Sequence, residues 1–162
     1  MPDQDTIDRA RQDAAEGKSP STQAGEFVRE EMHHVREGVH GARSTKQAIA
    51  IGLSKARRAG VELPPPPAGK SSTQARRKAS QDSSKARSQH RPSRKRSQAT
   101  LKALQREGRT AASHNALSDQ ARTSANKRGA EARHRSSMKA VRTRKIEGVR
   151  KTAKTRARRG SR

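Results

Sequence analysis

Hydrophobic residues follow a helical spacing in one part of the chain. Between residues 22 and 41, four large apolar residues recur at intervals of four, three and four positions: Val28, Met32, Val35 and Val39. This spacing places them on one face of a helix. Glycine at 38 or 41 supplies the left-handed conformation that commonly ends a helix. The pattern therefore predicts a first helix from about residue 22 to one of these glycines.

A second helix is expected a few residues later. Ser44-Thr45-Lys46-Gln47 has the form of a capping box, in which the serine hydroxyl accepts a hydrogen bond from the amide three residues on and the glutamine reaches back. An apolar stripe then runs from Ala48 to Ala56, and Gly60 stands where a C-terminal glycine is favoured. Together the two segments predict a helical hairpin domain at residues 22–61.

The remainder of the chain lacks such a pattern. Ile, Leu, Val and Phe contribute only 16 of 162 residues, too few to offset the conformational entropy of the whole chain. Ala, Arg and Lys favour helices after the prolines, but repulsion between like charges opposes those helices in free solution. We therefore expect a mostly disordered, all-α chain with four parts: an acidic disordered head (1–21), the helical hairpin domain (22–61), a proline-rich linker (62–69) and a basic, low-complexity, helix-prone tail (70–162).

Charge is divided unevenly along the sequence. Residues 1–37 carry 5 Lys/Arg against 9 Asp/Glu, whereas residues 38–162 carry 34 against 6. A cationic segment of this density predicts a polyanionic partner, of which nucleic acid is the commonest.

The composition also favours one kind of nucleic acid. Trp and Tyr are absent and one Phe is present, so the chain has no stacking platform for single strands, and duplex DNA is expected ahead of RNA. Contacts to phosphates carry little sequence information. The basic residues expected to make these contacts are Lys70, Arg76, Arg77, Lys78, Arg94, Lys95, Arg96, Arg142, Arg144, Lys145, Arg150, Lys151, Arg156, Arg158 and Arg159.

The sequence has no pattern typical of a catalytic or metal-binding site. The sequence has no nucleophile elbow and no glycine loop that would cradle a phosphate, so we expect no enzyme activity, no cofactor and no small-molecule substrate. His33 and His34 lie one helical turn from Glu37 and Glu30 respectively. Because neither a His-x-x-x-His pair nor a cysteine accompanies them or His40, no metal site is expected.

The order of residues from Lys46 to Gly60, together with Glu26–Gly38, resembles a family of short basic bacterial proteins catalogued under a domain of unknown function. Members are sometimes labelled plasmid stabilisation or DNA-binding proteins, and the resemblance implies a bacterial origin. The tail is similar in composition to linker-histone-like bacterial proteins. Neither resemblance supplies a catalytic residue.

These observations lead us to expect a non-enzymatic, nucleoid-associated or plasmid-maintenance type of protein in the bacterial cytoplasm, without membrane insertion, that binds double-stranded DNA. Two alternatives stay open. In one, the chain is a hydrophilic stress protectant, in keeping with its mean hydropathy of −1.25. In the other, the hairpin is an adaptor that recruits a protein partner, and six apolar residues either anchor the partner or form the hairpin core: Phe27, Val28, Met32, Val35, Ile49 and Leu53.

Overall fold

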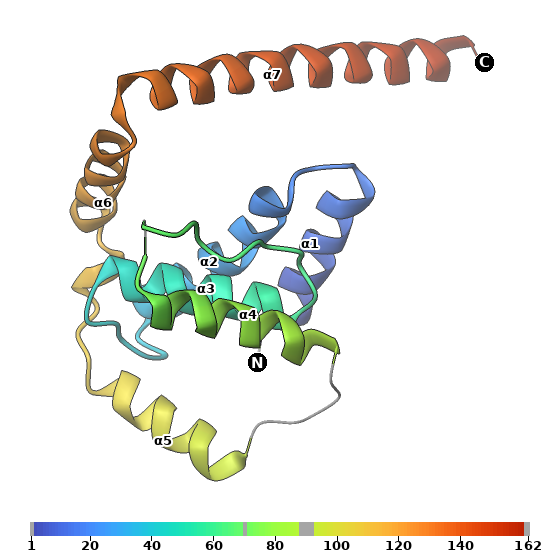
Figure 1. Ribbon diagram of the computed structural model, residues 1–162. Coiled ribbons are helices and arrows are strands. Elements are labelled where there is room, and N and C mark those ends of the chain that lie inside the picture. The colour runs from blue at the N-terminus through green and yellow to red at the C-terminus, as the bar shows by residue number, and fades with distance from the viewer. Residues whose placement is uncertain (1, 70, 88–92, 161–162) are drawn as a thin grey trace. The chain divides into compact units, whose positions relative to one another are not determined.

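The computed structural model describes residues 2–69, 71–87 and 93–160, and the side chains of these residues apart from 87, 147 and 149–160. The described chain forms two compact units, Met1–Ser118 and Asp119–Arg162. Its elements, all helical, are labelled in Figure 1: α1 (Gln4–Ala15), α2 (Pro20–Glu37), α3 (Thr45–Arg58), α4 (Thr73–Arg87), α5 (Arg94–Gln105), the short 3-10 helix η1 (Thr110–Ala112), α6 (His114–Lys127) and α7 (Gly129–Gly160).

The expectation of a mostly disordered chain with a lone two-helix hairpin is wrong. The segment 1–21, expected to be a disordered head, contains α1, and the segment 70–162 contains α4, α5, α6 and α7. High intrinsic helix propensity of Ala, Arg, Lys and Gln outweighs the charge repulsion in these segments. In addition, α1 packs against α2 and α4 packs against α3, so the hairpin is the centre of a larger helical unit.

Helices α2 and α3 lie side by side and make the most extensive contact between any two elements (Figure 1). Gly52 permits this approach, because a Cβ atom there would lie 2.8 Å from Val28 Cα and 3.0 Å from the carbonyl oxygen of Phe27. The serine half of the predicted capping box at the start of α3 is confirmed, whereas Gln47 reaches past Ser44 to the residue before it. Ser44 Oγ accepts a hydrogen bond from the amide of Gln47 at 3.2 Å, and Gln47 Oε1 accepts one from the amide of Arg43 at 2.9 Å.

The first hydrophobic cluster joins α1, α2 and α3. Its buried members are mainly small residues grouped around one aromatic ring: Ala10, Ala24, Phe27 and Ala56. On α1 the buried residues are Thr6 and Ala10, which explains why hydrophobic periodicity did not reveal this helix. An ion pair between Arg9 Nε and Glu26 Oε2 at 2.9 Å adds a polar link between α1 and α2.

The second hydrophobic cluster extends from the hairpin to a distant part of the chain. Its buried members come from α2, the loop 38–44, α3 and η1: Met32, Val35, Ala42, Ala48, Ala111 and Ala112. Backbone hydrogen bonds run from the Gly41 amide to the Leu104 carbonyl at 2.9 Å and from the Ala42 amide to the Gly108 carbonyl at 3.0 Å. The loop after α2 therefore holds the segment 104–112 against the hairpin.

In the second unit, residues 119–160, the helices lie open to solvent. None of the described side chains between 119 and 148 is buried. Helix α7 has 32 residues, which corresponds to a length of about 48 Å. Across the described residues, no helix combines the length and the apolar character that crossing a membrane would require.

We expect Gly52→Ala to destabilise the first unit by about 1–3 kcal/mol, because the new methyl group meets the α2 backbone and forces the two helices apart. Urea unfolding followed by circular dichroism measures this change. Gly25→Ala is the matched control: it lies within α2, a Cβ atom there meets nothing within 4 Å, and the substitution should stabilise by about 0.5–1 kcal/mol. Equal stabilisation by both substitutions would contradict the close approach of α2 and α3.

A separate prediction concerns the docking of the segment 104–112. A Cβ atom at Gly41 would lie 1.9 Å from the carbonyl oxygen of Glu107, so Gly41→Ala should release this segment from the loop and speed hydrogen exchange at the Ala42 amide. The control is Gly108→Ala, where the nearest atom to a new Cβ is Thr110 Oγ1 at 4.0 Å. If Ala42 exchanges at the same rate in the Gly41→Ala variant and the native chain, the docking is not as described.

Candidate functional site

The first candidate site is the set of basic residues on the helices after the prolines. Helix α5 begins with three consecutive exposed basic residues, Arg94, Lys95 and Arg96. Cations are unfavourable in the first turn of a helix, where unpaired amide groups already carry partial positive charge. A bound anion would relieve this repulsion, so the start of α5 is a surface suited to an anionic partner.

Helix α7 has the highest density of positive charge. It contains 12 Lys/Arg and 2 Glu among its 32 residues. Successive residues of a helix turn by about 100°, so Arg142, Arg144 and Lys145 point in three different directions. All three are exposed. These three basic residues are therefore not confined to one face of α7.

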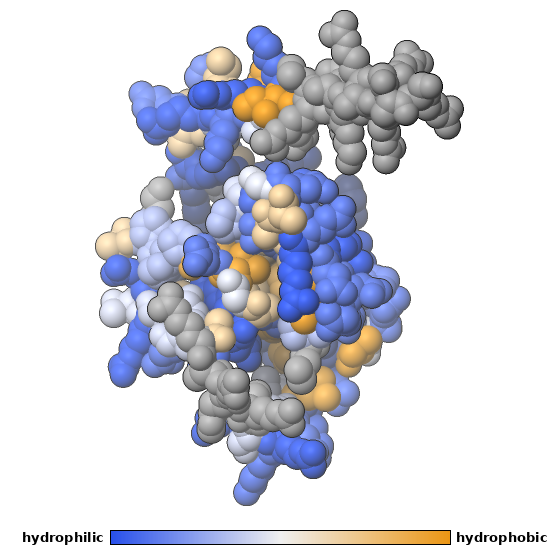
Figure 2. Space-filling view, turned by 90° about the vertical axis from the view of Figure 1, so that its right-hand side faces the viewer, coloured by the Kyte–Doolittle hydropathy of each residue, from blue (hydrophilic) through white to orange (hydrophobic). Residues whose placement is uncertain are grey.

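The residues expected to contact phosphates divide into two groups. Lys70 lies outside the described residues, as do the side chains of Arg150, Lys151, Arg156, Arg158 and Arg159. The other nine are all exposed on α4, α5 and α7: Arg76, Arg77, Lys78, Arg94, Lys95, Arg96, Arg142, Arg144 and Lys145. Among them Arg76 has an internal contact, since its Nε donates to the carbonyl oxygen of Pro66 at 3.2 Å. Figure 2 shows one face of the molecule, on which hydrophilic residues predominate and hydrophobic ones form small separate patches.

The six apolar residues considered as partner anchors lie within the two hydrophobic clusters. Phe27, Met32 and Val35 are buried, and Val28, Ile49 and Leu53 are partly buried and packed against them. In the structure these six residues therefore pack within the first unit.

The second candidate site is a cluster of charged side chains between α2 and α3. Glu31 is completely buried and Glu30 nearly so, and both face Lys55 of α3. The Lys55 ammonium nitrogen lies 2.8 Å from Glu31 Oε2 and 3.2 Å from Glu30 Oε1. Burial alone lowers the pKa of Lys55, but the two carboxylates outweigh burial and raise this pKa above its ordinary value. Lys55 is thus positively charged at neutral pH.

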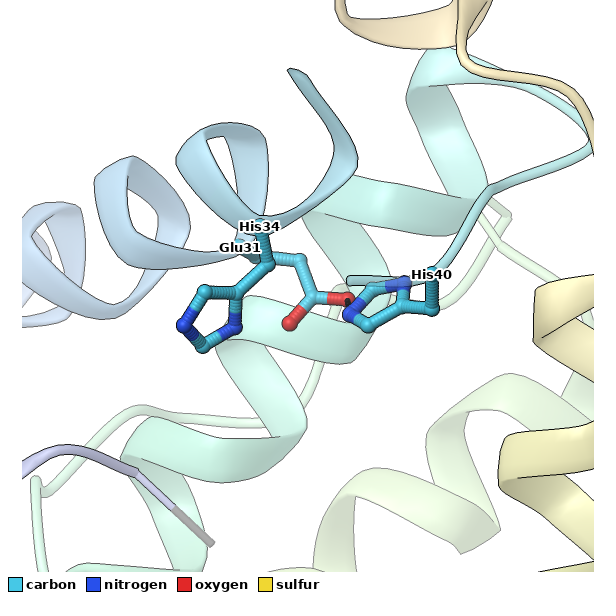
Figure 3. Close-up of side chains that lie close together, drawn as sticks. All are labelled: Glu31, His34 and His40. Carbon is cyan, nitrogen blue, oxygen red and sulfur yellow. Dashed lines mark ion pairs between the residues drawn. The ribbon is translucent and has the colours of Figure 1, made fainter. Parts of the chain in front are cut away.

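Two histidines complete this cluster, as Figure 3 shows for His34 and His40 beside Glu31. His40 Nε2 lies 3.3 Å from Glu31 Oε1, and His40 Nδ1 lies 3.1 Å from the carbonyl oxygen of Gly41. His34 Nε2 lies 3.4 Å from Asp3 Oδ2. Among the described residues, two groups have ligand atoms within 4.8 Å of one another and could hold a metal ion: Glu31, His34 and His40, and Asp3, Glu30 and His34. The first group is the more buried of the two.

The sequence indicated only part of this arrangement. The expected neighbours His33 and Glu37 pair at 2.9 Å, and His34 Nδ1 lies 3.9 Å from Glu30 Oε1. The grouping with Glu31 was missed, because it depends on the chain turning back at Gly38, which adopts a left-handed conformation with φ of 79°. The spacing of Glu31 and His34, three residues apart on α2, was the signal available in the sequence for two of the three residues.

Comparison with known proteins supports the resemblance to a family of unknown function. Residues 19–66 match the model of a family described as "Family of unknown function (DUF6496)". The matched segment includes α2, α3 and the charged cluster, and it ends before α4. No curated protein and no solved structure matches the chain.

The charged cluster leads to a prediction about stability. Lys55→Gln leaves Glu30 and Glu31 buried without their cation and should destabilise the protein by about 3–5 kcal/mol at pH 7. Because the folded pKa of Lys55 is raised, its contribution is fully present below the unfolded pKa and is lost as the pH rises through the folded pKa. Urea unfolding at neutral and alkaline pH measures both effects.

Lys46→Gln is the matched control for this substitution, since Lys46 is an exposed lysine of the same helix. It should change the free energy of unfolding by less than about 0.5 kcal/mol. Similar effects of the two substitutions at pH 7, or a Lys55 effect that grows with rising pH, would refute the role given to the buried ion pairs.

Proposed function

We propose that this protein binds double-stranded DNA through phosphate contacts made by its basic helices, with low sequence specificity and without enzyme activity. Its role is that of a nucleoid-associated or plasmid-maintenance protein of the bacterial cytoplasm. The observation that carries the proposal is α7, a helix of 32 residues whose sequence holds 12 Lys/Arg.

The diameter of α7 fits the major groove of DNA. An α-helix with its side chains is about 10–12 Å across, and the major groove of B-DNA is about 12 Å wide. A helix in this groove has phosphates on both sides, so basic residues on several faces can each reach one. Duplex DNA carries about one negative charge per 1.7 Å of its axis, a density sufficient to neutralise the excess of ten positive charges on α7.

A membrane surface fits α7 less well than DNA. A helix that lies on a membrane needs a continuous apolar face opposite its basic face. The exposed apolar residues Met138, Val141 and Ile146 do not form such a face, because at about 100° per residue Lys145 falls between Val141 and Met138 and Arg142 falls between Met138 and Ile146. Basic residues therefore interrupt the only candidate apolar stripe among the described side chains of α7.

The salt dependence of DNA binding tests this proposal. If the intact chain neutralises about 8–10 phosphates, the logarithm of the association constant should fall against the logarithm of salt concentration with a slope of about −7 to −9. A triple variant in which Gln replaces Arg142, Arg144 and Lys145 preserves helix propensity. Its slope against salt should be less steep by about 3. Fluorescence anisotropy of a labelled duplex measures both slopes.

The matched control replaces Ser136, Ser137 and Thr143, which are exposed uncharged residues of α7, with Gln and should leave the slope unchanged. A slope shallower than about −3 for the intact chain would refute binding through many phosphates. Equal affinity for heparin, duplex RNA and duplex DNA would replace the proposal with general polyanion binding.

A further inference from the structure

We infer that Glu31, His34 and His40 form a binding site for one divalent transition-metal ion, for which Zn²⁺ is the best match. The site lies between α2 and the loop 38–44 (Figure 3), and the basic helices α4, α5 and α7 come later in the sequence. It is independent of the proposed DNA binding. The inference rests on the geometry around His40, on the buried oxygens of Glu31 and on the orientation of His34.

The first observation concerns the protonation of His40. A carbonyl oxygen only accepts hydrogen bonds, so the contact of His40 Nδ1 with the Gly41 carbonyl at 3.1 Å places a proton on Nδ1. In the neutral ring, Nε2 then directs a lone pair at Glu31 Oε1, 3.3 Å away. Two electron-pair donors that face each other need a cation between them.

The separation of these two atoms fits two ligands of one metal ion. Charge-assisted N–H to carboxylate hydrogen bonds measure about 2.7–2.9 Å between heavy atoms, which is shorter than the observed 3.3 Å. A tetrahedral zinc ion with bonds of about 2.0–2.1 Å holds its nitrogen and oxygen ligands about 3.3–3.4 Å apart. Glu31 Oε1 and His40 Nε2 are therefore already at the spacing of two zinc ligands.

The second observation concerns the buried oxygens of Glu31. The Glu31 side chain has no exposed surface, and its Oε1 accepts no hydrogen bond. Lys55 forms an ion pair with Oε2 at 2.8 Å, which leaves Oε1 to coordinate a metal.

The balance of buried charges also favours a bound cation. Glu30 and Glu31 carry two buried negative charges, and the Lys55 ammonium between them carries one positive charge. Two buried carboxylates against one ammonium leave an excess negative charge, which is costly in the interior of a protein. A divalent cation compensates it.

His34 has the orientation of a metal ligand with a carboxylate behind it. In Figure 3 one ring nitrogen of His34 faces Glu31 and the other faces away. The Nε2 atom lies 3.4 Å from Asp3 Oδ2, so it is suited to donate its proton to that carboxylate while Nδ1 binds the metal. Carboxylates in this position are typical of histidine ligands and fix the orientation of the ring.

The donor set selects the kind of metal. Two imidazole nitrogens and one carboxylate oxygen suit Zn²⁺, whereas Mg²⁺ and Ca²⁺ prefer oxygen ligands alone. Three protein ligands leave one tetrahedral position for water. Because His40 is adjacent to Gly41, whose amide binds the Leu104 carbonyl at 2.9 Å, a bound ion would also fix the loop that holds the segment 104–112.

The test uses the full chain after treatment with a chelator. Titration with ZnCl₂ by calorimetry should show one saturable site per chain, and CoCl₂ should produce the visible absorption of a tetrahedral complex. His40→Gln and His34→Gln should each weaken binding by about 100-fold or more, because losing a ligand costs more than the roughly 10–100-fold that loss of an outer-shell partner costs. His33→Gln is the matched control, because His33 is an exposed histidine of α2 paired with Glu37, and it should bind Zn²⁺ as the native chain does.

A second measurement covers the case in which a substitution at the site unfolds the protein. In the native chain, Zn²⁺ should shift the imidazole nitrogen resonances of His34 and His40 and leave those of His33 and His114 unchanged. The inference is overturned if the native chain shows no one-to-one binding, if a folded His40→Gln variant retains it, or if the shifted resonances belong to other histidines. A His40 ring protonated on both nitrogens and insensitive to Zn²⁺ would identify an internal ion pair in place of the metal.

Discussion

The first unit depends on the ion pairs of Lys55 with Glu30 and Glu31. These two carboxylates lie on the face of α2 that packs against α3, and both are removed from water. Lys55, brought by α3 at the right height along the helix, offsets part of this charge, so any other register of the two helices would leave both carboxylates without their lysine. The pairing of α2 with α3 in turn creates the two hydrophobic clusters that receive α1 and η1.

Small residues allow a chain with few large apolar side chains to pack in this way. Alanines supply most of the buried hydrophobic residues, and Gly52 and Gly41 permit backbones to approach within the space that a side chain would occupy. Close backbone approach multiplies dispersion contacts per unit area. It also forms the hydrogen bonds between the loop 38–44 and the segment 104–108. A composition test that counts Leu, Ile, Val and Phe overlooks this kind of core, which is why it predicted disorder.

Local patterns in the sequence were sufficient for α2, α3 and the capping box at Ser44, because apolar spacing and capping chemistry act over a few residues. Helix α1 was missed, since its buried face consists of Thr6 and Ala10 in place of large apolar residues.

The group of Glu31, His34 and His40 was missed for a different reason. It needs the left-handed turn at Gly38 and the packing of α3 on α2, neither of which is recorded in the spacing of the histidines. Long-range contacts such as Arg36 Nε with the Ala112 carbonyl, 76 residues apart, were likewise beyond local reasoning.

The distribution of acidic residues links the fold to the proposed function. Carboxylates of α1 and α2 are engaged inside the first unit, where Glu26 pairs with Arg9 and Arg29 and where Glu30 and Glu31 pair with Lys55. Residues 68–162 hold 29 Lys/Arg against 5 Asp/Glu, so most basic groups there lack a carboxylate of their own segment to pair with. Neutralising them requires an external polyanion or small counterions, and releasing those counterions is what drives binding to DNA. The segment that matches the family of unknown function ends before these helices, so the family relationship bears on the hairpin and its charged cluster, and the case for DNA binding rests on the helices that follow.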